Sequence, residues 1–499
     1  MRLFRRRPRV LLAAATALLA AVASSAWSAA PGARAAAAAP PPNIVFILTD
    51  DLSWNLIQYL PQVQLLQHDG VTFTNYTVTD SLCCPSRSSI FTGKFPHDTG
   101  VFTNGGTDGG FGVFKGRGNE ERTYATALQA RGYATAMMGK YLNGYLPADT
   151  QGGSLPYVPP GWSEWDVAGN GYAEYNYDLN ENHAVVHYGS APADYLTNVL
   201  AGKGSAFIQR NAAASKPFVL EIATFAPHAP FTPAKQDLDA FPGLTAPRSP
   251  AFNTLPAGAP GWLAGADPLT AAEKTKIDTD FRKRAQSVQA VDRMIAKLRT
   301  TLTNSGVADD TYFVFSSDNG FHLGEYRLPQ GKQTAFDTDV RVPLVIAGPG
   351  VPAGSTRAEI VQNIDLAPTF QRLAGGIVAS DVNGRSLVPL LQGQPAANWR
   401  TASLIEHHGP NAAADDPDAQ TARNGNPTTY EALRTATYTY VEYTNGEREY
   451  YDRVADPFQL NNIAAQLSAS RRAALHAALQ QLRDCHTHES CWTAGHVTA

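Results

Sequence analysis

The chain contains 499 residues, of which 43% are hydrophobic and 17% are charged. This composition is typical of a large globular protein and excludes a disordered, collagen-like or coiled-coil chain. The formal net charge is −4, and it becomes −10 without the six arginines of residues 1–42, a segment that has no acidic residue. Because an acidic protein has no overall field that attracts nucleic acid or an anionic membrane, we expect no nucleic-acid partner and expect any anionic ligand to meet a local positive cluster.

The first 35 residues have the pattern of an export signal peptide. An arginine-rich start is followed by an apolar, alanine-rich stretch at residues 10–27 and by the small-residue pattern Ala33-Arg34-Ala35. We predict removal of residues 1–35, a Pro/Ala spacer at residues 36–42, and secretion to the extracellular space, or to the periplasm if the host has an outer membrane. An uncleaved membrane anchor is disfavoured because the many alanines make the stretch weakly hydrophobic, so we expect no stable membrane insertion after cleavage.

Short apolar runs predict the strands of a sheet that is buried on both faces. They lie at residues 43–48, 134–138, 218–224, 312–315 and 342–347. Between several of them the apolar residues have helical spacing, most clearly at residues 280–303, where they recur every three or four positions. Strands that alternate with helices predict an α/β fold with a doubly wound, mostly parallel sheet, which we assign to a catalytic domain at residues 43–400.

Several segments depart from this alternation. Residues 144–195 and 225–268 are rich in Gly, Asn, Tyr or Pro and predict long ordered excursions near a site, whereas residues 411–427 predict a mobile loop. Residues 435–443 and 449–451 have the alternation of a hairpin around Asn445-Gly446, and residues 468–482 that of an amphipathic helix. These elements predict a smaller α+β subdomain at residues 401–499.

The last two of the four cysteines, Cys485 and Cys491, lie close together near the end of the chain. In an exported protein this spacing predicts a local disulfide. His486, His488 and His496 lie nearby, but their spacing fits no standard zinc motif, and a disulfide would consume the thiolates.

The first two cysteines lie in the densest motif of the chain, Cys83-Cys84-Pro85-Ser86-Arg87. It resembles the Cys-x-Pro-Ser-Arg signature of the type I, formylglycine-dependent sulfatases. The resemblance implies that a separate formylglycine-generating enzyme oxidises Cys83 to an aldehyde, that the hydrated aldehyde is the nucleophile, and that Cys84 occupies the unspecified position. The segment also predicts a helix at residues 85–92 just after Cys83, since Pro85 suits a first turn.

Two further motifs resemble the metal-binding half-sites of the same family. They are NIVFILTDD at residues 43–51 and Ser317-Asp318-Asn319-Gly320. The resemblance implies that Asp50, Asp51, Asp318 and Asn319 bind a metal together with the modified Cys83. A set of carboxylate and amide oxygens suits Ca²⁺, and Mg²⁺ is the less favoured ion. Both motifs follow predicted strands, where ligands of open α/β sheets collect.

The remaining catalytic residues also rest on the resemblance. Lys140 lies in Gly139-Lys140, His228 in Pro227-His228-Ala229-Pro230, and Lys332 in Gly331-Lys332. With Arg87, the two lysines are implied to stabilise the sulfate, and His228 to act on the leaving oxygen. Many sulfatases have a histidine two residues after the first lysine, but this chain has Leu142. His322 and His183 are two candidates for that missing function.

The resemblance extends from residue 43 to about residue 465. Local runs such as GKYLNGY (139–145) and YVPPGW (157–162) are most similar to N-acetylglucosamine-6-sulfatases and extracellular heparan endosulfatases. The family implies an alkaline-phosphatase-like fold and hydrolysis of sulfate monoesters, on sulfated sugars such as N-acetylglucosamine 6-sulfate or on aryl sulfates. The alternatives are a phosphomonoester or phosphonate monoester hydrolase of the same superfamily and a non-catalytic protein that binds sulfated glycans; the latter is disfavoured because the nucleophile and metal ligands are present.

Overall fold

The computed structural model describes residues 41–410, 416 and 418–498. The predicted signal peptide and residues 36–40 of the predicted spacer lie outside the described residues. The described residues form one compact unit. In the described part of this unit, no helix combines the length and the hydropathy that a bilayer-spanning segment needs.

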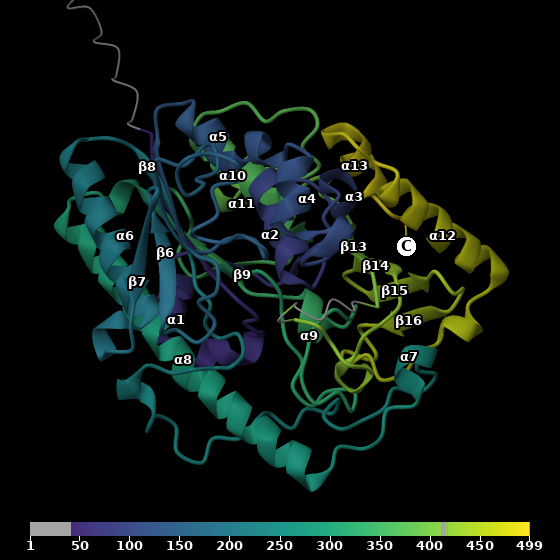
Figure 1. Cartoon of the computed structure of the whole chain (residues 1–499). Helices are drawn as coiled ribbons and strands as arrows, with labels where there is room; N and C mark the ends of the chain where they lie inside the picture. The colour runs from purple at the N-terminus through teal and green to yellow at the C-terminus, as the bar shows by residue number, and fades with distance from the viewer. Residues whose placement is uncertain (1–40, 411–415, 417, 499) are drawn as a thin grey trace, which may run out of the picture. The chain divides into compact units, whose positions relative to one another are not determined.

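A ten-stranded sheet runs through the centre of this unit (Figure 1). Its strands lie in the order β11 (Ser355–Arg357), β2 (Val71–Phe73), β10 (Leu344–Ala347), β9 (Thr311–Ser317), β1 (Asn43–Thr49), β8 (Phe218–Ala223), β4 (Ala134–Lys140), β5 (Glu164–Ala168), β6 (Tyr177–Glu181) and β7 (Ala184–Tyr188). The central strands, from β9 to β5, are parallel to one another. The predicted α/β fold with a mostly parallel sheet is therefore confirmed.

Strand β1 shows why the sequence forms a buried parallel strand. All seven of its residues are buried. Ile44, Phe46 and Leu48 pack in the core on one face of the sheet, whereas Val45 and Ile47 pack in the core on the opposite face. An uninterrupted apolar run satisfies both cores at once because successive side chains of a strand point to opposite faces.

Helices cover both faces of the sheet (Figure 1). One face packs against α1 (Pro61–Asp69), α6 (Leu196–Ala213) and α8 (Ala271–Asn304), and the other against α2 (Cys83–Thr92), α5 (Tyr124–Gln129) and α10 (Leu366–Leu373). The long helix α8 begins at Ala271, earlier than the apolar periodicity predicted. The reason is a capping box, in which Thr270 and Glu273 each accept a hydrogen bond from the other's backbone N–H.

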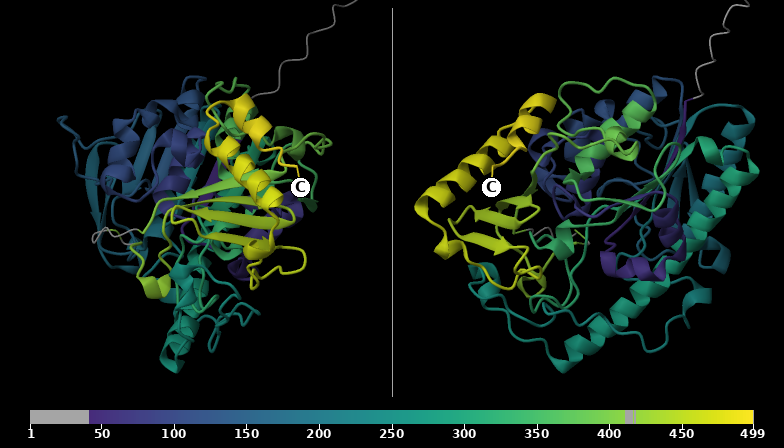
Figure 2. Two further views of the ribbon diagram at one scale, coloured as in Figure 1. Left: turned by 90° about the vertical axis from the view of Figure 1, so that its right-hand side faces the viewer. Right: turned by 180° about the vertical axis from the view of Figure 1, so that it is seen from behind.

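The C-terminal part forms a second, antiparallel sheet that α12 (Ala469–Arg483) covers (Figure 2). Its strands follow chain order: β13 (Ala402–His407), β14 (Tyr430–Thr435), β15 (Tyr438–Tyr443) and β16 (Arg448–Asp452). The Cys485–Cys491 disulfide links the end of α12 to α13 (His488–Ala494), as predicted. The boundary proposed between residues 400 and 401 remains a prediction, although β13 begins beside it.

Two parts of the sheet differ from the sequence-based expectation. Strand β10 was expected among the parallel strands, but it runs antiparallel to β9. The connection from β9 to β10, residues 318–343, is long enough for a parallel crossover, but its only α-helix is the short α9 (Asp337–Val340). The excursion at residues 144–195 contains β5, β6 and β7, which extend the sheet instead of lying outside it.

The other elements are short. They are β3 (Tyr76–Thr77) paired with β12 (Val361–Gln362), and the helices α3 (Pro96–Thr99), α4 (Gly110–Gly116), α7 (Gly261–Ala264) and α11 (Val388–Leu391).

Candidate active site

Four neighbouring parallel strands end at one edge of the sheet and bring the predicted residues together there. Asp50 and Asp51 directly follow β1, Asp318 and Asn319 directly follow β9, Lys140 ends β4, and His228 lies in the segment after β8. The carboxyl edge of a parallel sheet is where α/β proteins bind their ligands. Residues almost 270 positions apart therefore touch: the backbone N–H of Asp51 donates to Asp318 Oδ1 over 3.2 Å.

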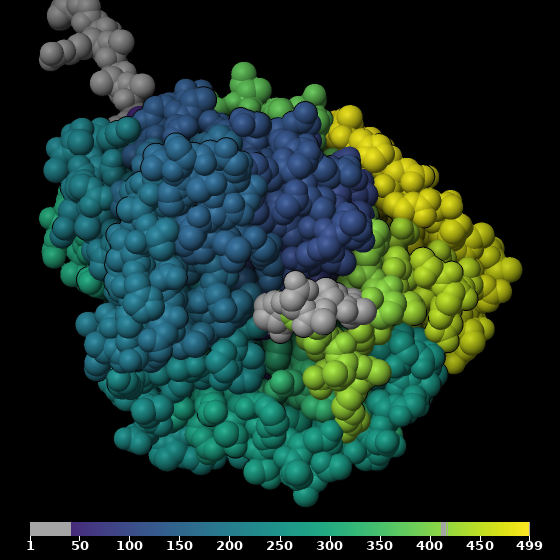
Figure 3. Space-filling model, viewed as in Figure 1, coloured from purple at the N-terminus to yellow at the C-terminus, as the bar shows by residue number. Residues whose placement is uncertain are grey.

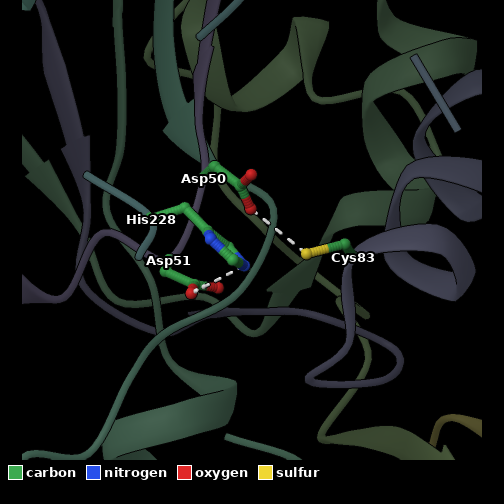
Figure 4. A group of neighbouring side chains, drawn as sticks. All are labelled: Asp50, Asp51, Cys83 and His228. Atoms are coloured by element: carbon green, nitrogen blue, oxygen red, sulfur yellow. Dashed lines mark hydrogen bonds and ion pairs between the residues drawn. The ribbon is translucent and has the colours of Figure 1, made fainter. Parts of the chain in front are cut away.

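Cys83 approaches this edge from a helix, with its sulfur pointing toward Asp50 (Figure 4). It is the first residue of α2, so the helix begins two residues earlier than predicted. Its Sγ lies 3.1 Å from Asp50 Oδ1 and 2.9 Å from Lys332 Nζ. Cys84 packs in the core instead, while its backbone N–H donates to Asn104 Oδ1 over 2.9 Å.

Three basic side chains neutralise the carboxylates of the site. Arg87 Nε donates to Asp318 Oδ2 over 2.8 Å, and Arg87 Nη1 donates to the Lys140 carbonyl over 2.8 Å. Lys140 Nζ lies 2.5 Å from Asp50 Oδ2. Lys332 Nζ, carried in by the long segment after β9, lies 2.6 Å from Asp51 Oδ1. All of these side chains are buried, so their charges act in a medium of low polarity, where electrostatic interactions are strong.

The acidic residues have the arrangement that a hard cation needs. Asn319 Nδ2 donates to Asp51 Oδ1 over 2.7 Å, but Asn319 Oδ1 is buried and makes no hydrogen bond to any described residue. Burial raises the pKa of Asp50 and outweighs the attraction of Lys140. Ligand atoms of Asp50, Asp51, Cys83 and His228 lie within 4.8 Å of one another. The residues present therefore fit a metal ion held mainly by oxygen atoms.

The backbone around Asp51 supports this arrangement. Asp51 adopts a φ of 65°, a left-handed conformation that is uncommon for a residue other than glycine. The buried Arg284 donates to the Asp51 carbonyl oxygen, and also to the Pro227 carbonyl over 3.3 Å. Strained conformations of this kind persist where the surrounding structure enforces them, and they cluster at functional sites.

The pKa values of the site residues shift in different directions. Burial opposes ionisation of Asp318, but Arg87, Lys140 and Lys332 outweigh it and lower the pKa of Asp318 to about 2. Burial and the surrounding carboxylates raise the pKa of the Cys83 thiol well above its ordinary value. Because the nucleophilic form of cysteine is the thiolate, unmodified Cys83 is a poor nucleophile in this environment.

One residue of the site, Asp418, carries no sequence motif and was not predicted. It lies in the segment between β13 and β14 and is buried. Its Oδ1 is 2.6 Å from His228 Nε2 and 2.8 Å from Lys332 Nζ, and its Oδ2 accepts from Asn104 Nδ2 over 2.8 Å. Burial favours a neutral His228, but Asp418 and Asp51 outweigh it and raise the pKa of His228. The C-terminal part of the chain thus supplies a carboxylate to the site.

Neither candidate for the missing histidine reaches these residues. His322 is buried with Nδ1 3.0 Å from Asp339 Oδ2 and Nε2 2.9 Å from the Asn424 carbonyl. His183 lies at the surface, with Nδ1 2.8 Å from the Pro156 carbonyl. Leu142 packs in the apolar core. The group that lies beside Lys140 is the Tyr172 ring, whose centroid is 4.9 Å from Lys140 Nζ and 4.6 Å from the His228 ring.

Comparisons with known proteins agree with this geometry. The model of the sulfatase family matches residues 42–377, and that of the C-terminal part of N-sulphoglucosamine sulphohydrolase matches residues 324–485. N-acetylglucosamine-6-sulfatase from Homo sapiens is 34% identical over 91% of this chain and 86% of its own length. The extracellular sulfatase SULF-1 homolog of Drosophila melanogaster is 36% identical over 76% of this chain, which spans 34% of that longer protein.

A solved structure described as BT4656 in complex with its substrate D-glucosamine-2-N,6-O-disulfate is similar to this one, with a TM-score of 0.74. The two share 25% sequence identity, and the match covers 89% of this chain and 97% of the other. Its fold is the alkaline-phosphatase-like fold of the family, with the large mixed sheet and the C-terminal antiparallel sheet. The chain therefore belongs to the sulfatase family and is an enzyme that hydrolyses sulfate esters.

Proposed function

We propose that this sulfatase removes sulfate from sulfated glucosamine residues, with N-acetylglucosamine 6-sulfate as the leading substrate, and that formylglycine made from Cys83 is its nucleophile. The position of Cys83 carries the proposal. Its Sγ lies among the ends of the parallel strands, in contact with both Asp50 and Lys332. The substrate class is supported by the N-acetylglucosamine-6-sulfatase relative and by the disulfated glucosamine bound in the similar structure.

The chemistry of sulfate esters explains why a modified residue is needed. The sulfur atom is shielded by anionic oxygens, so hydrolysis needs neutralised charge and a nucleophile held in line with the leaving alcohol. A buried, neutral thiol meets neither need. Hydrated formylglycine supplies one hydroxyl for attack on sulfur and a second hydroxyl, absent from serine or cysteine, whose deprotonation restores the aldehyde and releases sulfate.

The chain's own residues orient the substrate and move the proton. Arg87, Lys140 and Lys332 neutralise charge on the sulfate oxygens and fix the sulfur beside position 83. His228 holds a proton at Nε2, the nitrogen that faces Asp418 and Asp51, and donates it to the departing oxygen. Asp418 is a positioning residue, because its Oδ1 holds both His228 and Lys332.

Asp50, Asp51, Asp318 and Asn319, together with the modified residue 83, would hold the metal ion, for which Ca²⁺ is favoured over Mg²⁺. The ion supplies positive charge that favours deprotonation of the nucleophile and stabilises developing negative charge.

We further propose that the enzyme acts outside the cytoplasm after a formylglycine-generating enzyme has modified it. The predicted signal peptide, the Cys485–Cys491 disulfide and the extracellular sulfatase among its relatives support this location. Aryl sulfates serve as simple test substrates.

The experiment compares protein made with and without a co-expressed formylglycine-generating enzyme. Mass spectrometry of the peptide that contains residue 83 measures the aldehyde fraction, and sulfate release is measured on N-acetylglucosamine 6-sulfate, an aryl sulfate and the matching aryl phosphate. We expect sulfate release to rise in proportion to the aldehyde fraction and the aryl phosphate to be a poor substrate. Full activity of protein with an unmodified thiol contradicts the nucleophile, and inactivity on the sugar with activity on the aryl sulfate contradicts the substrate.

A further inference from the structure

A second group of possible metal ligands lies where α3 meets the C-terminal tail. His97 and Asp98 belong to α3, and His486 follows the disulfide-bonded Cys485. One ligand atom from each of these three side chains lies within 4.8 Å of the others. In Figure 3 the dark blue surface of the segment that contains α3 lies against the yellow surface of the C-terminal helices. None of these residues takes part in the catalytic arrangement described above.

The distances in this group match those of a tetrahedral zinc site. Ligands 2.0–2.2 Å from Zn²⁺ lie about 3.4 Å from one another in a tetrahedron. Here His486 Nδ1 is 2.6 Å from Asp98 Oδ1, and His97 Nε2 is 3.8 Å from Asp98 Oδ2. The Cys485 carbonyl oxygen lies 2.7 Å from His97 Nε2. These separations bracket the tetrahedral value, so small side-chain movements suffice to admit an ion.

The surroundings of the group also favour a metal. His97 Nδ1 lies 2.9 Å from the carboxylate of Glu406 in β13, so Nε2 is the ring nitrogen turned toward Asp98. A carboxylate behind the imidazole is the usual outer partner of a metal-bound histidine, since it orients the ring and increases its basicity. Asp98 Oδ2 is shielded from solvent and makes no hydrogen bond to any residue that the structure describes. This oxygen therefore has an unused acceptor position 3.8 Å from His97 Nε2.

We propose that His97 Nε2, Asp98 and His486 Nδ1 bind one Zn²⁺, with the Cys485 carbonyl or a water molecule as the fourth ligand. Two imidazoles and one carboxylate suit zinc better than Ca²⁺ or Mg²⁺, which prefer oxygen ligands only. Binding replaces the proton on His97 Nε2 and releases it to solvent. The ion links the disulfide-bonded C-terminal tail to α3. Helix α3 directly follows α2, which begins at Cys83.

The experiment uses full-length enzyme saturated with Ca²⁺, so that the catalytic ligands are occupied, and Co²⁺ as a coloured probe for zinc. Tetrahedral Co²⁺ absorbs strongly in the visible range, and Zn²⁺ should displace it. We compare the wild type with His486→Ala, whose side chain is 63% exposed and is therefore expected to tolerate replacement, and with Asp98→Asn. His488→Ala is the matched control, because His488 contacts the Gly384 carbonyl and lies outside the group.

We expect the wild type and His488→Ala to bind one equivalent of Co²⁺ more than His486→Ala and Asp98→Asn, with a visible band that only the first two proteins show. Zn²⁺ should raise the unfolding temperature of the first two proteins and leave that of His486→Ala unchanged. A wild type without the band, or a His486→Ala protein that keeps the same band and stoichiometry, overturns the proposal.

Discussion

Two groups of charged residues in this enzyme, the buried active site and a partly buried cluster, are built differently. In the Asp337 cluster, which comprises Asp337, Arg434 and Arg453, Asp337 accepts from Arg434 over 2.7 Å and 2.9 Å and from Arg453 over 2.7 Å. At the active site, by contrast, the single nitrogen atom of Lys332 is shared among Asp51, Cys83 and Asp418, and Asn319 Oδ1 accepts no hydrogen bond from any described residue. Both carboxylate oxygens of Asp337 accept from arginines, whereas the active site contains a buried acceptor, Asn319 Oδ1, that no described residue fills.

The pKa values of the carboxylates in the two groups shift in opposite directions. Burial opposes ionisation of Asp337, but Arg434 and Arg453 outweigh it and lower its pKa far below the ordinary value. The pKa of Asp50 is raised instead, because burial outweighs the attraction of Lys140. The Asp337 cluster is thus compensated without any ligand, which indicates a role in holding α9 against β14. Within the active site, Asp50 is a carboxylate whose burial is not fully offset, and shifted pKa values of this kind cluster at sites selected for function rather than for stability.

The largest effect should come from the centre of the active site. Replacing Cys83 with Ser removes the precursor of the aldehyde, so we expect kcat for sulfate release to fall by at least about 10³-fold while the fold is retained. Circular dichroism checks the fold, and mass spectrometry checks for a stable sulfated serine. Turnover close to that of the wild type would contradict the proposed nucleophile.

The second largest effect on catalysis should come from Lys332, whose positive charge is proposed to stabilise the sulfate. Lys332→Met removes the ammonium group that contacts Asp51, Cys83 and Asp418, and we expect kcat to fall by about 10²–10³-fold. Lys216→Met is the matched control, because Lys216 is exposed and precedes β8, at the opposite end of this strand from the active site. If both variants keep similar activity, Lys332 has no part in stabilising the transition state.

A substitution in the Asp337 cluster should lower the stability of the protein and leave catalysis unchanged. Asp337→Asn removes the anion that pairs with Arg434 and Arg453, and with Arg341 at 3.5 Å. We expect the free energy of unfolding to fall by about 3 kcal/mol in urea titrations at neutral pH. The folded fraction should keep its kcat, and Asp484→Asn, at an exposed carboxylate, should change stability by less than about 1 kcal/mol.

The difference in stability between the wild type and Asp337→Asn should depend on pH. Because the folded-state pKa of Asp337 lies below its unfolded-state value, its contribution to stability is complete above about pH 4 and is lost as the pH falls further. The difference between wild type and Asp337→Asn should therefore shrink in acid. A difference that grows below pH 4 would show that another group stabilises this cluster.

The smallest effect should come from the residue that joins the C-terminal part to the active site. Asp418→Asn weakens charged hydrogen bonds to His228 and Lys332, and we expect kcat/KM to fall about tenfold. Asp309→Asn, at an exposed position, is the control. An unchanged or increased kcat/KM would show that Asp418 does not position these two residues for catalysis.

The sequence by itself determined the parts of the protein that depend on neighbouring residues. Strand β1 follows from one uninterrupted apolar run, and the amphipathic α8 from its spacing. The motif around Cys83 and the aspartates after β1 and β9 identified the family and most of the candidate site. These signals are local because strand burial, helix amphipathicity and short motifs are each contained in a few consecutive residues.

Only the tertiary structure decided what lies far apart along the chain. It brought Asp418 to His228 across 190 positions and His486 to Asp98 across 388 positions, and it showed that neither His322 nor His183 lies beside Lys140. It also set the antiparallel direction of β10. No local pattern encodes such contacts, because they depend on how the connections between strands cross the sheet and on which loop ends fold back over its carboxyl edge.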